Sequence, residues 1–258
     1  MWQALIARTA ASPIGAHESV ILGSSIWLAY SADRWFEGWR VKPGNIRTSR
    51  HLFYQRWRWP VAAAWACVLV LDVAGSLLWL PTPELRAGLV LLVPVSAYLL
   101  SHQLVHRESP WRAPKEFCVA LLLAAGAAAF AATAPGAHAG RVVAPSVLFA
   151  LLCLSNCALI SLWERDVDQS HGQTSLATQF GRSAALRALP WVAAGILASS
   201  VFWAGRRAGA EAACGAASGV LLGIVDLAEP RIGRRLARVL ADAALLTPAL
   251  PLLSGLIA

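Results

Sequence analysis

Residues 60–80 read PVAAAWACVLVLDVAGSLLWL and contain a single charged residue, Asp72. An α-helix rises 1.5 Å per residue, so about 20 apolar residues cross the roughly 30 Å hydrocarbon core of a bilayer. The stretch therefore predicts a transmembrane helix, and similar stretches recur along the chain.

Eight apolar stretches of this kind are separated by short joints rich in Pro, Gly and charged residues. The first is the least apolar because it contains His17 and Glu18. The pattern predicts an all-α, polytopic transmembrane bundle that forms a single integral membrane domain over residues 1–258. The predicted spans are 14–31, 60–80, 84–104, 115–134, 142–163, 184–205, 209–227 and 237–257.

The composition supports a membrane protein and excludes other classes. Apolar residues make up 57% of the chain and charged residues 14%, against about half and a quarter in soluble proteins. Such hydrophobicity excludes a disordered chain, and the sparse charge argues against a nucleic-acid partner. The five Cys lie in apolar runs, so we interpret them as small buried residues and not as disulfides or a zinc site.

Basic residues predict the orientation of the bundle. Of the 22 Lys and Arg, 17 fall in the loops that follow the first, third, fifth and seventh spans. The positive-inside rule places these loops in the cytoplasm, including a basic and aromatic loop at residues 32–59. We therefore expect an integral protein of a bacterial inner membrane, since the Arg-, Ala- and Trp-rich usage is typical of a high-GC bacterium.

Acidic residues gather at the same predicted cytoplasmic side. Asp33 and Glu37 follow the first span, and Glu164 and Asp168 follow the fifth. If each helix continues that far, both are i,i+4 pairs on one helical face. Mg²⁺ takes oxygen ligands from one or two carboxylates and shares the rest with phosphates and water. A metal site shared with a polyanion is one interpretation, and a solvated rim of salt bridges is the other.

These residues resemble the two aspartate-rich motifs of the UbiA superfamily of intramembrane prenyltransferases. In the first motif Asp33 and Glu37 match the last two acids, while Ala29-Tyr30 replaces the leading Asn-Asp. In the second, Glu164 and Asp168 match two acids and are followed by Gly172 and Ser175-Leu176 at the family spacing, with Ser161 replacing the first acid. Lys115-Glu116 resembles a basic pair at the start of an intervening helix.

The resemblance implies a bundle of about nine helices and the transfer of a prenyl chain from its diphosphate to a lipophilic acceptor in the bilayer. It also implies Mg²⁺, with Asp33 and Glu37 for one ion and Glu164 and Asp168 for another. Lys115 is the cation that we expect to contact diphosphate. Further candidates for substrate binding are Tyr30, Arg34, Arg165 and Asn156, although the two arginines can instead neutralise neighbouring acids and Asn156 can link helices.

Two other functions remain open. One is a UbiA-like protein that has lost transfer activity and binds isoprenoids or partner proteins, which the missing Asn-Asp favours. The other is a small proton-coupled transporter that uses the acids within spans, Glu18, Asp72 and Asp242. The pattern carries no information on donor length, acceptor identity or oligomeric state.

Overall fold

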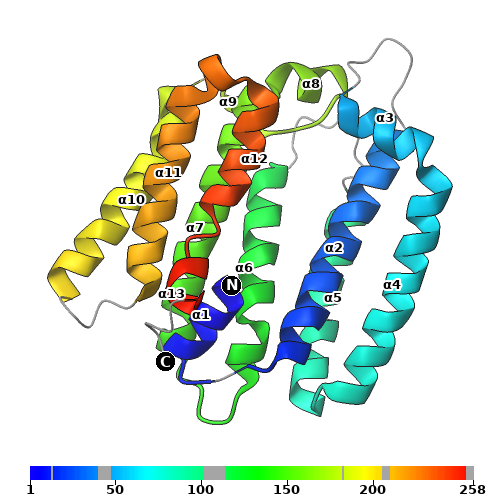
Figure 1. The fold of residues 1–258 in the computed structure, drawn as a ribbon, viewed down its shortest axis with the longest axis vertical. Coiled ribbons are helices and arrows are strands. Elements are labelled where there is room, and N and C mark those ends of the chain that lie inside the picture. Colours follow the sequence, from blue (N-terminus) through cyan, green and yellow to red (C-terminus); the bar gives the residue numbers. More distant parts are fainter. Residues whose placement is uncertain (13, 40–47, 102–113, 182, 205–209, 254–258) are drawn as a thin grey trace. The chain divides into compact units, whose positions relative to one another are not determined.

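The computed structural model describes residues 1–12, 14–39, 48–101, 114–181, 183–204 and 210–253. Every regular element in these ranges is a helix (Figure 1). Five helices are long and apolar enough to cross a membrane, which confirms the predicted all-α bundle. They are α4 (Arg58–Trp79), α5 (Thr82–Leu100), α6 (Lys115–Thr133), α7 (Ala139–Trp163) and α11 (Ala210–Ile232).

The remaining predicted spans differ in length or continuity. The spans 14–31 and 184–205 correspond to α2 (Ala16–Trp39) and α10 (Ala184–Ala204). The prediction of one helix over 237–257 is wrong, because α12 (Arg234–Ala244) and the short α13 (Ala249–Leu253) are separate. Pro248 lies between them and disfavours a helical residue before it. Predicted span ends at 102–104, 205, 209 and 254–257 lie outside the described residues.

The chain divides into two compact units, and the single integral membrane domain stays a prediction. Unit 1 contains Met1–Pro13, Pro114–Arg165 and Ser175–Ala258, and unit 2 contains Ile14–Ala113 and Asp166–Thr174. The chain therefore passes from unit 1 to unit 2 and back twice, and each unit has its own helix packing.

Unit 1 packs α6, α7, α10, α11 and α12 around a core of small and aliphatic side chains. Among the fully buried core residues are Leu159, Leu222 and Ala237. The sequence did not predict α1 (Trp2–Thr9), which lies against α6 and α7. The Trp2 ring stacks on Phe149 at a centroid distance of 5.0 Å, and its Nε1–H donates to Leu245 O at 2.8 Å.

Close approach of α10 and α11 depends on a small residue. A Cβ at Gly219 would lie 2.9 Å from the Cβ of Ala194 and 2.9 Å from the carbonyl oxygen of Pro190. Small residues that let backbones approach are typical of helix contacts in lipid. The Ala- and Gly-rich stretch that contains Gly219 thus has a packing reason.

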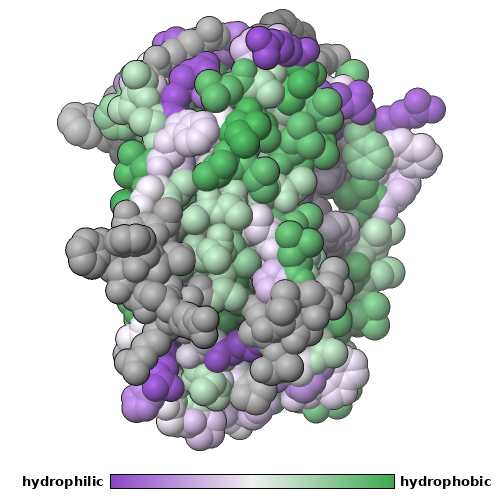
Figure 2. Space-filling view, turned by 60° about the vertical axis from the view of Figure 1, so that its left-hand side comes forward, coloured by the Kyte–Doolittle hydropathy of each residue, from purple (hydrophilic) through white to green (hydrophobic). Residues whose placement is uncertain are grey.

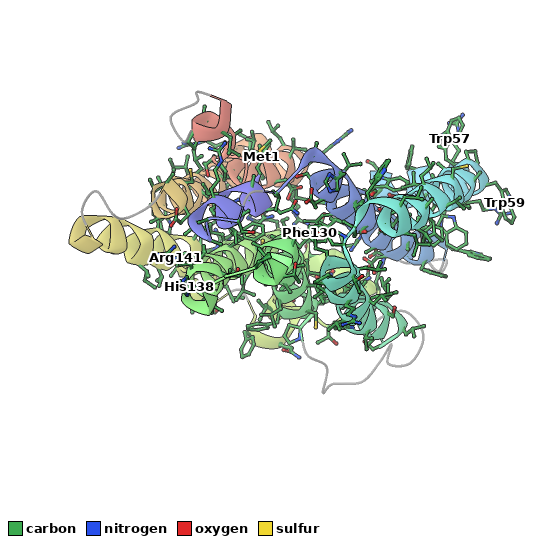
Figure 3. All side chains as sticks on the ribbon, turned by 90° about the horizontal axis from the view of Figure 1, so that it is seen from below. Met1, Trp57, Trp59, Phe130, His138 and Arg141 are labelled. Carbon is green, nitrogen blue, oxygen red and sulfur yellow. The ribbon has the colours of Figure 1, made fainter. Side chains whose placement is uncertain are left out.

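Unit 2 packs α2 against α3 (Ser49–Arg56), α4 and α5, and in Figure 1 the short α3 lies at the upper ends of α2 and α4. Most of the predicted loop 32–59 is helical: α2 continues to Trp39, α3 follows, and residues 40–47 lie outside the described residues. Trp57 and Trp59 project outward where α4 begins (Figure 3) and are 47% and 67% exposed. Exposed aromatics at a helix end are typical of an anchor at a membrane interface.

Large apolar side chains cover the outside of α4. Leu71 and Leu78 are 71% and 77% exposed, and none of the larger residues of this helix is buried. On the face drawn in Figure 2, hydrophobic residues cover the middle and hydrophilic residues gather towards the ends. Contiguous apolar surface of this kind is rare on soluble monomers, so lipid is the solvent that suits it.

Candidate functional site

A buried ion triad lies at the C-terminal end of α2, beyond the predicted span 14–31. Arg34 donates from Nη2 to Asp33 Oδ2 at 2.7 Å and from Nη1 to Glu37 Oε2. Asp33 and Glu37 are 8% and 6% exposed. The two carboxylates predicted to share a metal are therefore brought together, and a guanidinium bridges them.

The electrostatics of the triad keep Arg34 charged. Burial alone would lower the pKa of the Arg34 guanidinium, but the carboxylates of Glu37 and Asp33 raise this pKa well above its ordinary value. The guanidinium carbon also lies 5.6 Å from the centroid of the Tyr30 ring, within range of a cation–π contact. Tyr30, predicted to bind substrate, is half exposed beside the triad.

Three residues from two other segments of unit 2 meet Glu37. Gln173 donates from Nε2 to Glu37 Oε1 at 2.7 Å, and His51 Nε2 lies 3.7 Å from the same oxygen. The rings of His51 and His171 lie 4.7 Å apart at an interplanar angle of 33°. We call the six residues Asp33, Arg34, Glu37, His51, His171 and Gln173 the α2 cluster.

Local backbone structure positions the two histidines. Thr48 is the N-cap of α3, and its backbone N–H donates to His51 Nδ1 at 3.1 Å in a capping box. After α8 (Arg165–Ser170), Gly172 turns the chain with a φ of 62°, in the left-handed region that favours glycine. The glycine of the second motif therefore has a structural role in the turn that carries His171.

The second acidic pair does not form as predicted. Helix α7 ends at Trp163 and Glu164 has non-helical dihedral angles, so Glu164 and Asp168 do not share one helical face. Glu164 belongs to unit 1 and accepts from Arg238 Nη1, whereas Asp168 belongs to unit 2 and is 5% exposed. No Gly or Pro marks this helix end in the sequence; the partners of Trp163 and Glu164 on α11 and α12 hold it.

The other predicted substrate-binding residues belong to unit 1. Lys115 begins α6, and Arg165 begins α8. Asn156 is buried and donates from Nδ2 to Asp242 Oδ1 at 3.1 Å, which is the helix-linking alternative for this residue. Within unit 1, Asn156 thus forms a hydrogen bond that links α7 to α12.

The acids of the transporter hypothesis hold separate local contacts. Asp72 accepts from the hydroxyls of Ser24 and Ser25, the latter at 2.8 Å, and thereby links α4 to α2. Glu18 lies 3.2 Å from His17. Asp242 accepts from Asn156 in unit 1, so the three acids are divided between the two units.

One buried acid, Asp226, escaped the sequence analysis, and a second, Glu116, was named there only as part of a motif. Asp226 on α11 is 3% exposed and accepts from Trp163 Nε1 at 3.0 Å and from Arg187 Nη1 at 3.1 Å. Glu116 is 2% exposed and accepts the Leu176 N–H at 3.2 Å, where α9 (Leu176–Phe180) begins. An acid inside an apolar span was the available signal for Asp226.

The resemblance implies Mg²⁺, so the atoms of the α2 cluster can be compared with the ligands that this ion prefers. Mg²⁺ prefers oxygen ligands and needs near-octahedral access. The Arg34 guanidinium donates to both acids and takes the position between Asp33 and Glu37 that a shared ion would need. The described arrangement does not fit Mg²⁺ held between these two acids, and dependence on Mg²⁺ stays a prediction.

Comparisons of the chain with protein-family models, with curated proteins and with solved structures gave no match.

Proposed function

We propose that this chain is a UbiA-like intramembrane prenyltransferase, which binds a prenyl diphosphate at the α2 cluster and transfers the prenyl chain to a lipophilic acceptor. One observation carries the proposal: a buried triad of Asp33, Arg34 and Glu37 ends a helix of an apolar bundle. Ionisable groups in such a setting are costly, so they are functional candidates by default.

The chemistry asks for a polar end and an apolar body in one site. The allylic C–O bond breaks, diphosphate leaves, a bond to the acceptor forms, and the acceptor loses a proton. Arg34 offers a planar donor fork that matches phosphate oxygens. The exposed ring of Tyr30 beside it offers an apolar surface for the first isoprene unit. The apolar side chains of the helices provide a hydrophobic environment for the prenyl chain.

A second candidate function is favoured by a specific contact. Arg34 engages both carboxylates of the first motif, and Arg238 engages Glu164 of the second. Acids that are already paired with arginines favour the second hypothesis, a protein of the same fold that binds isoprenoids or partner proteins but does not transfer the prenyl chain. The net charge of the triad does not distinguish the transferase from the binding protein. Two carboxylates and one guanidinium give the triad one negative charge under both hypotheses.

Binding of a non-hydrolysable prenyl thiodiphosphate to the purified protein, with and without Mg²⁺, tests both candidates without a known acceptor. We expect binding that Glu37→Gln and Asp33→Asn abolish. The matched control is Asp166→Asn, which removes an exposed acid from α8. Glu164→Gln tests the second motif in the same assay.

The outcomes divide the hypotheses. Binding followed by release of diphosphate from the natural donor in an acceptor screen supports transfer. Binding without release supports the second candidate. Absence of binding in the wild type contradicts both and moves attention to Asp72 and the transporter hypothesis.

We also propose that the α2 cluster faces the cytoplasm of a bacterial inner membrane. The excess of Lys and Arg in the loops on that side supports this orientation. Labelling of a cysteine placed at the exposed Ser49, in a chain without its native Cys, tests it: the cysteine should react in inverted vesicles and stay protected in intact cells.

A further inference from the structure

Three buried side chains in unit 2 present metal-ligand atoms to one another. They are Glu37 on α2, His51 on α3 and His171 after α8, with exposed fractions of 6%, 2% and 8%. One carboxylate oxygen and two imidazole nitrogens lie within 4.8 Å of one another. All three residues belong to the same compact unit, although more than a hundred residues separate His51 from His171 in the chain.

His51 has a ring nitrogen without a hydrogen-bond partner. Its Nε2 atom is buried and makes no hydrogen bond within the part of the chain that the structure describes. The Glu37 Oε1 atom, 3.7 Å away, is too distant for a hydrogen bond. A buried polar group left without a hydrogen bond is unfavourable, so it calls for an explanation.

We infer that Glu37, His51 and His171 bind one divalent first-row transition-metal ion, with Zn²⁺ as its type. Imidazole nitrogen suits zinc, iron, copper and nickel, whereas Mg²⁺ takes oxygen ligands. Two His and one carboxylate form the donor set of catalytic zinc sites and of iron sites with open positions. Glu37 together with the two histidines thus suits a softer ion than Mg²⁺.

The contacts around Glu37 hold its carboxylate in one orientation, as is typical of a metal-coordinating side chain. Arg34 donates to Oε2 and Gln173 donates to Oε1 at 2.7 Å, which fixes the orientation of the carboxylate. Metal-bound carboxylates are commonly hydrogen-bonded in this way. A carboxylate oxygen has two lone pairs, so Oε1 can accept from Gln173 and bind an ion.

Binding through His51 Nε2 requires the proton of the imidazole to sit on Nδ1. Thr48 Oγ1 lies 3.2 Å from Nδ1 and can accept a hydrogen bond from Nδ1–H. Metal-bound histidines commonly donate such a hydrogen bond from their other ring nitrogen. The change replaces the present contact from the Thr48 N–H to Nδ1 at 3.1 Å. Thr48 is therefore a positioning residue for the site.

The ligand atoms need only small movements. A tetrahedral ion with bonds of about 2.0–2.1 Å places its nitrogen ligands roughly 3.4 Å apart. The ligand atoms now lie within 4.8 Å of one another, so side-chain rotations that move them by about an ångström would bring them to the bound separation. Three protein ligands leave a coordination position for water or for an anionic ligand such as a phosphate oxygen.

Metal titration of the full chain in detergent, after removal of metals with a chelator, tests the inference without any prenyl donor. We expect one equivalent of Zn²⁺ per chain by competition with a chromophoric chelator, and visible d–d absorption when Co²⁺ is bound. His51→Ala and His171→Ala should each lower the affinity at least about 100-fold. Thr48→Val should lower it about 10-fold while it leaves the ligands in place.

His17→Ala is the matched control, because His17 also lies beside a glutamate of unit 2 but outside the cluster. Its affinity should equal that of the wild type. Circular dichroism and the melting temperature of each metal-free variant separate loss of a ligand from loss of the fold. A wild type that binds no stoichiometric zinc overturns the inference, as does equal binding by all variants or displacement by an equal concentration of Mg²⁺.

The inference goes beyond the proposed function and stands apart from it. Zinc binding without binding of prenyl thiodiphosphate contradicts the proposed function alone. Binding of prenyl thiodiphosphate by a chain that takes up no zinc contradicts the metal site alone.

Discussion

Each compact unit buries a carboxylate on a long helix, Asp226 within α11 and Glu37 near the end of α2, and the two sites differ in how well their polar atoms are hydrogen-bonded. In unit 1, Asp226 accepts from Trp163 and Arg187, and no oxygen of Asp226 is among the buried atoms left without a partner in the described chain. In unit 2, Glu37 gathers Arg34 and Gln173, but the neighbouring His51 keeps an unsatisfied nitrogen. A hydrogen-bonded buried charge can hold helices together, whereas a buried atom without a hydrogen bond calls for an explanation, and at the α2 cluster we propose a ligand.

The largest expected effect is in unit 1. Asp226→Ala leaves the buried Trp163 N–H unpaired and removes the partner of Arg187, whose side chain is 44% exposed and can regain water. We expect a loss of about 3 kcal/mol in the free energy of unfolding, near the lower limit for breaking a buried pair. Thermal unfolding in detergent measures it. An unchanged melting temperature would mean that the Asp226 site is not structural.

Arg34→Gln should destabilise unit 2 by about 2 kcal/mol near neutral pH, because two buried carboxylates lose their shared cation. Melting temperatures of the wild type and of Arg34→Gln at neutral pH provide the check. In the wild type Arg34 is charged at this pH, since its carboxylate neighbours raise its pKa. Equal melting temperatures of the two proteins would contradict the ion triad.

Gly219→Ala tests the packing of unit 1 without touching a charge. The added Cβ meets the backbone of Pro190 and the Cβ of Ala194 at 2.9 Å, so we expect a loss of about 1.5 kcal/mol. Gly195→Ala is the matched control, because nothing lies within 4 Å of its added Cβ. It should be neutral or stabilising by up to about 1 kcal/mol. Equal effects of both changes in thermal unfolding would place α10 farther from α11 than described.

The smallest effect is expected for Ser25→Ala in unit 2. The change removes one of the two hydroxyl donors to Asp72 between α2 and α4. Hydrogen bonds between membrane helices are worth about 0.6 kcal/mol on average, so the melting temperature should fall only slightly. A loss as large as that of Asp226→Ala would show that Asp72 is a second satisfied site comparable with unit 1.

The sequence predicted the helical class because hydrophobic run length alone determines which segments can span a bilayer. It predicted the meeting of Asp33 and Glu37 because four residues on one helix make one turn. The break of α7 at Glu164 depends on tertiary partners such as Arg238, which local pattern does not reveal. The split of 237–257 was foreseeable from Pro248, since the residue before a proline resists a helical conformation.

His51 and His171 were visible in the sequence but could not be paired from it. They lie on separate segments, and only the packing of α3 and the turn at Gly172 bring their rings together. The same limit concealed Asp226, whose partners lie on two other helices of unit 1. Spacing along one helix is readable from sequence, whereas meetings between helices require the fold.

Ligand-induced stabilisation measures the central claim, that the α2 cluster binds a ligand and the Asp226 site does not. Prenyl thiodiphosphate at 100 times its dissociation constant, with Mg²⁺ or Zn²⁺ present, should stabilise the wild type by about 2.7 kcal/mol. Glu37→Gln should abolish this gain, and Asp226→Asn should keep it despite a lower starting melting temperature. A gain that survives Glu37→Gln, or no gain in the wild type, would contradict the account.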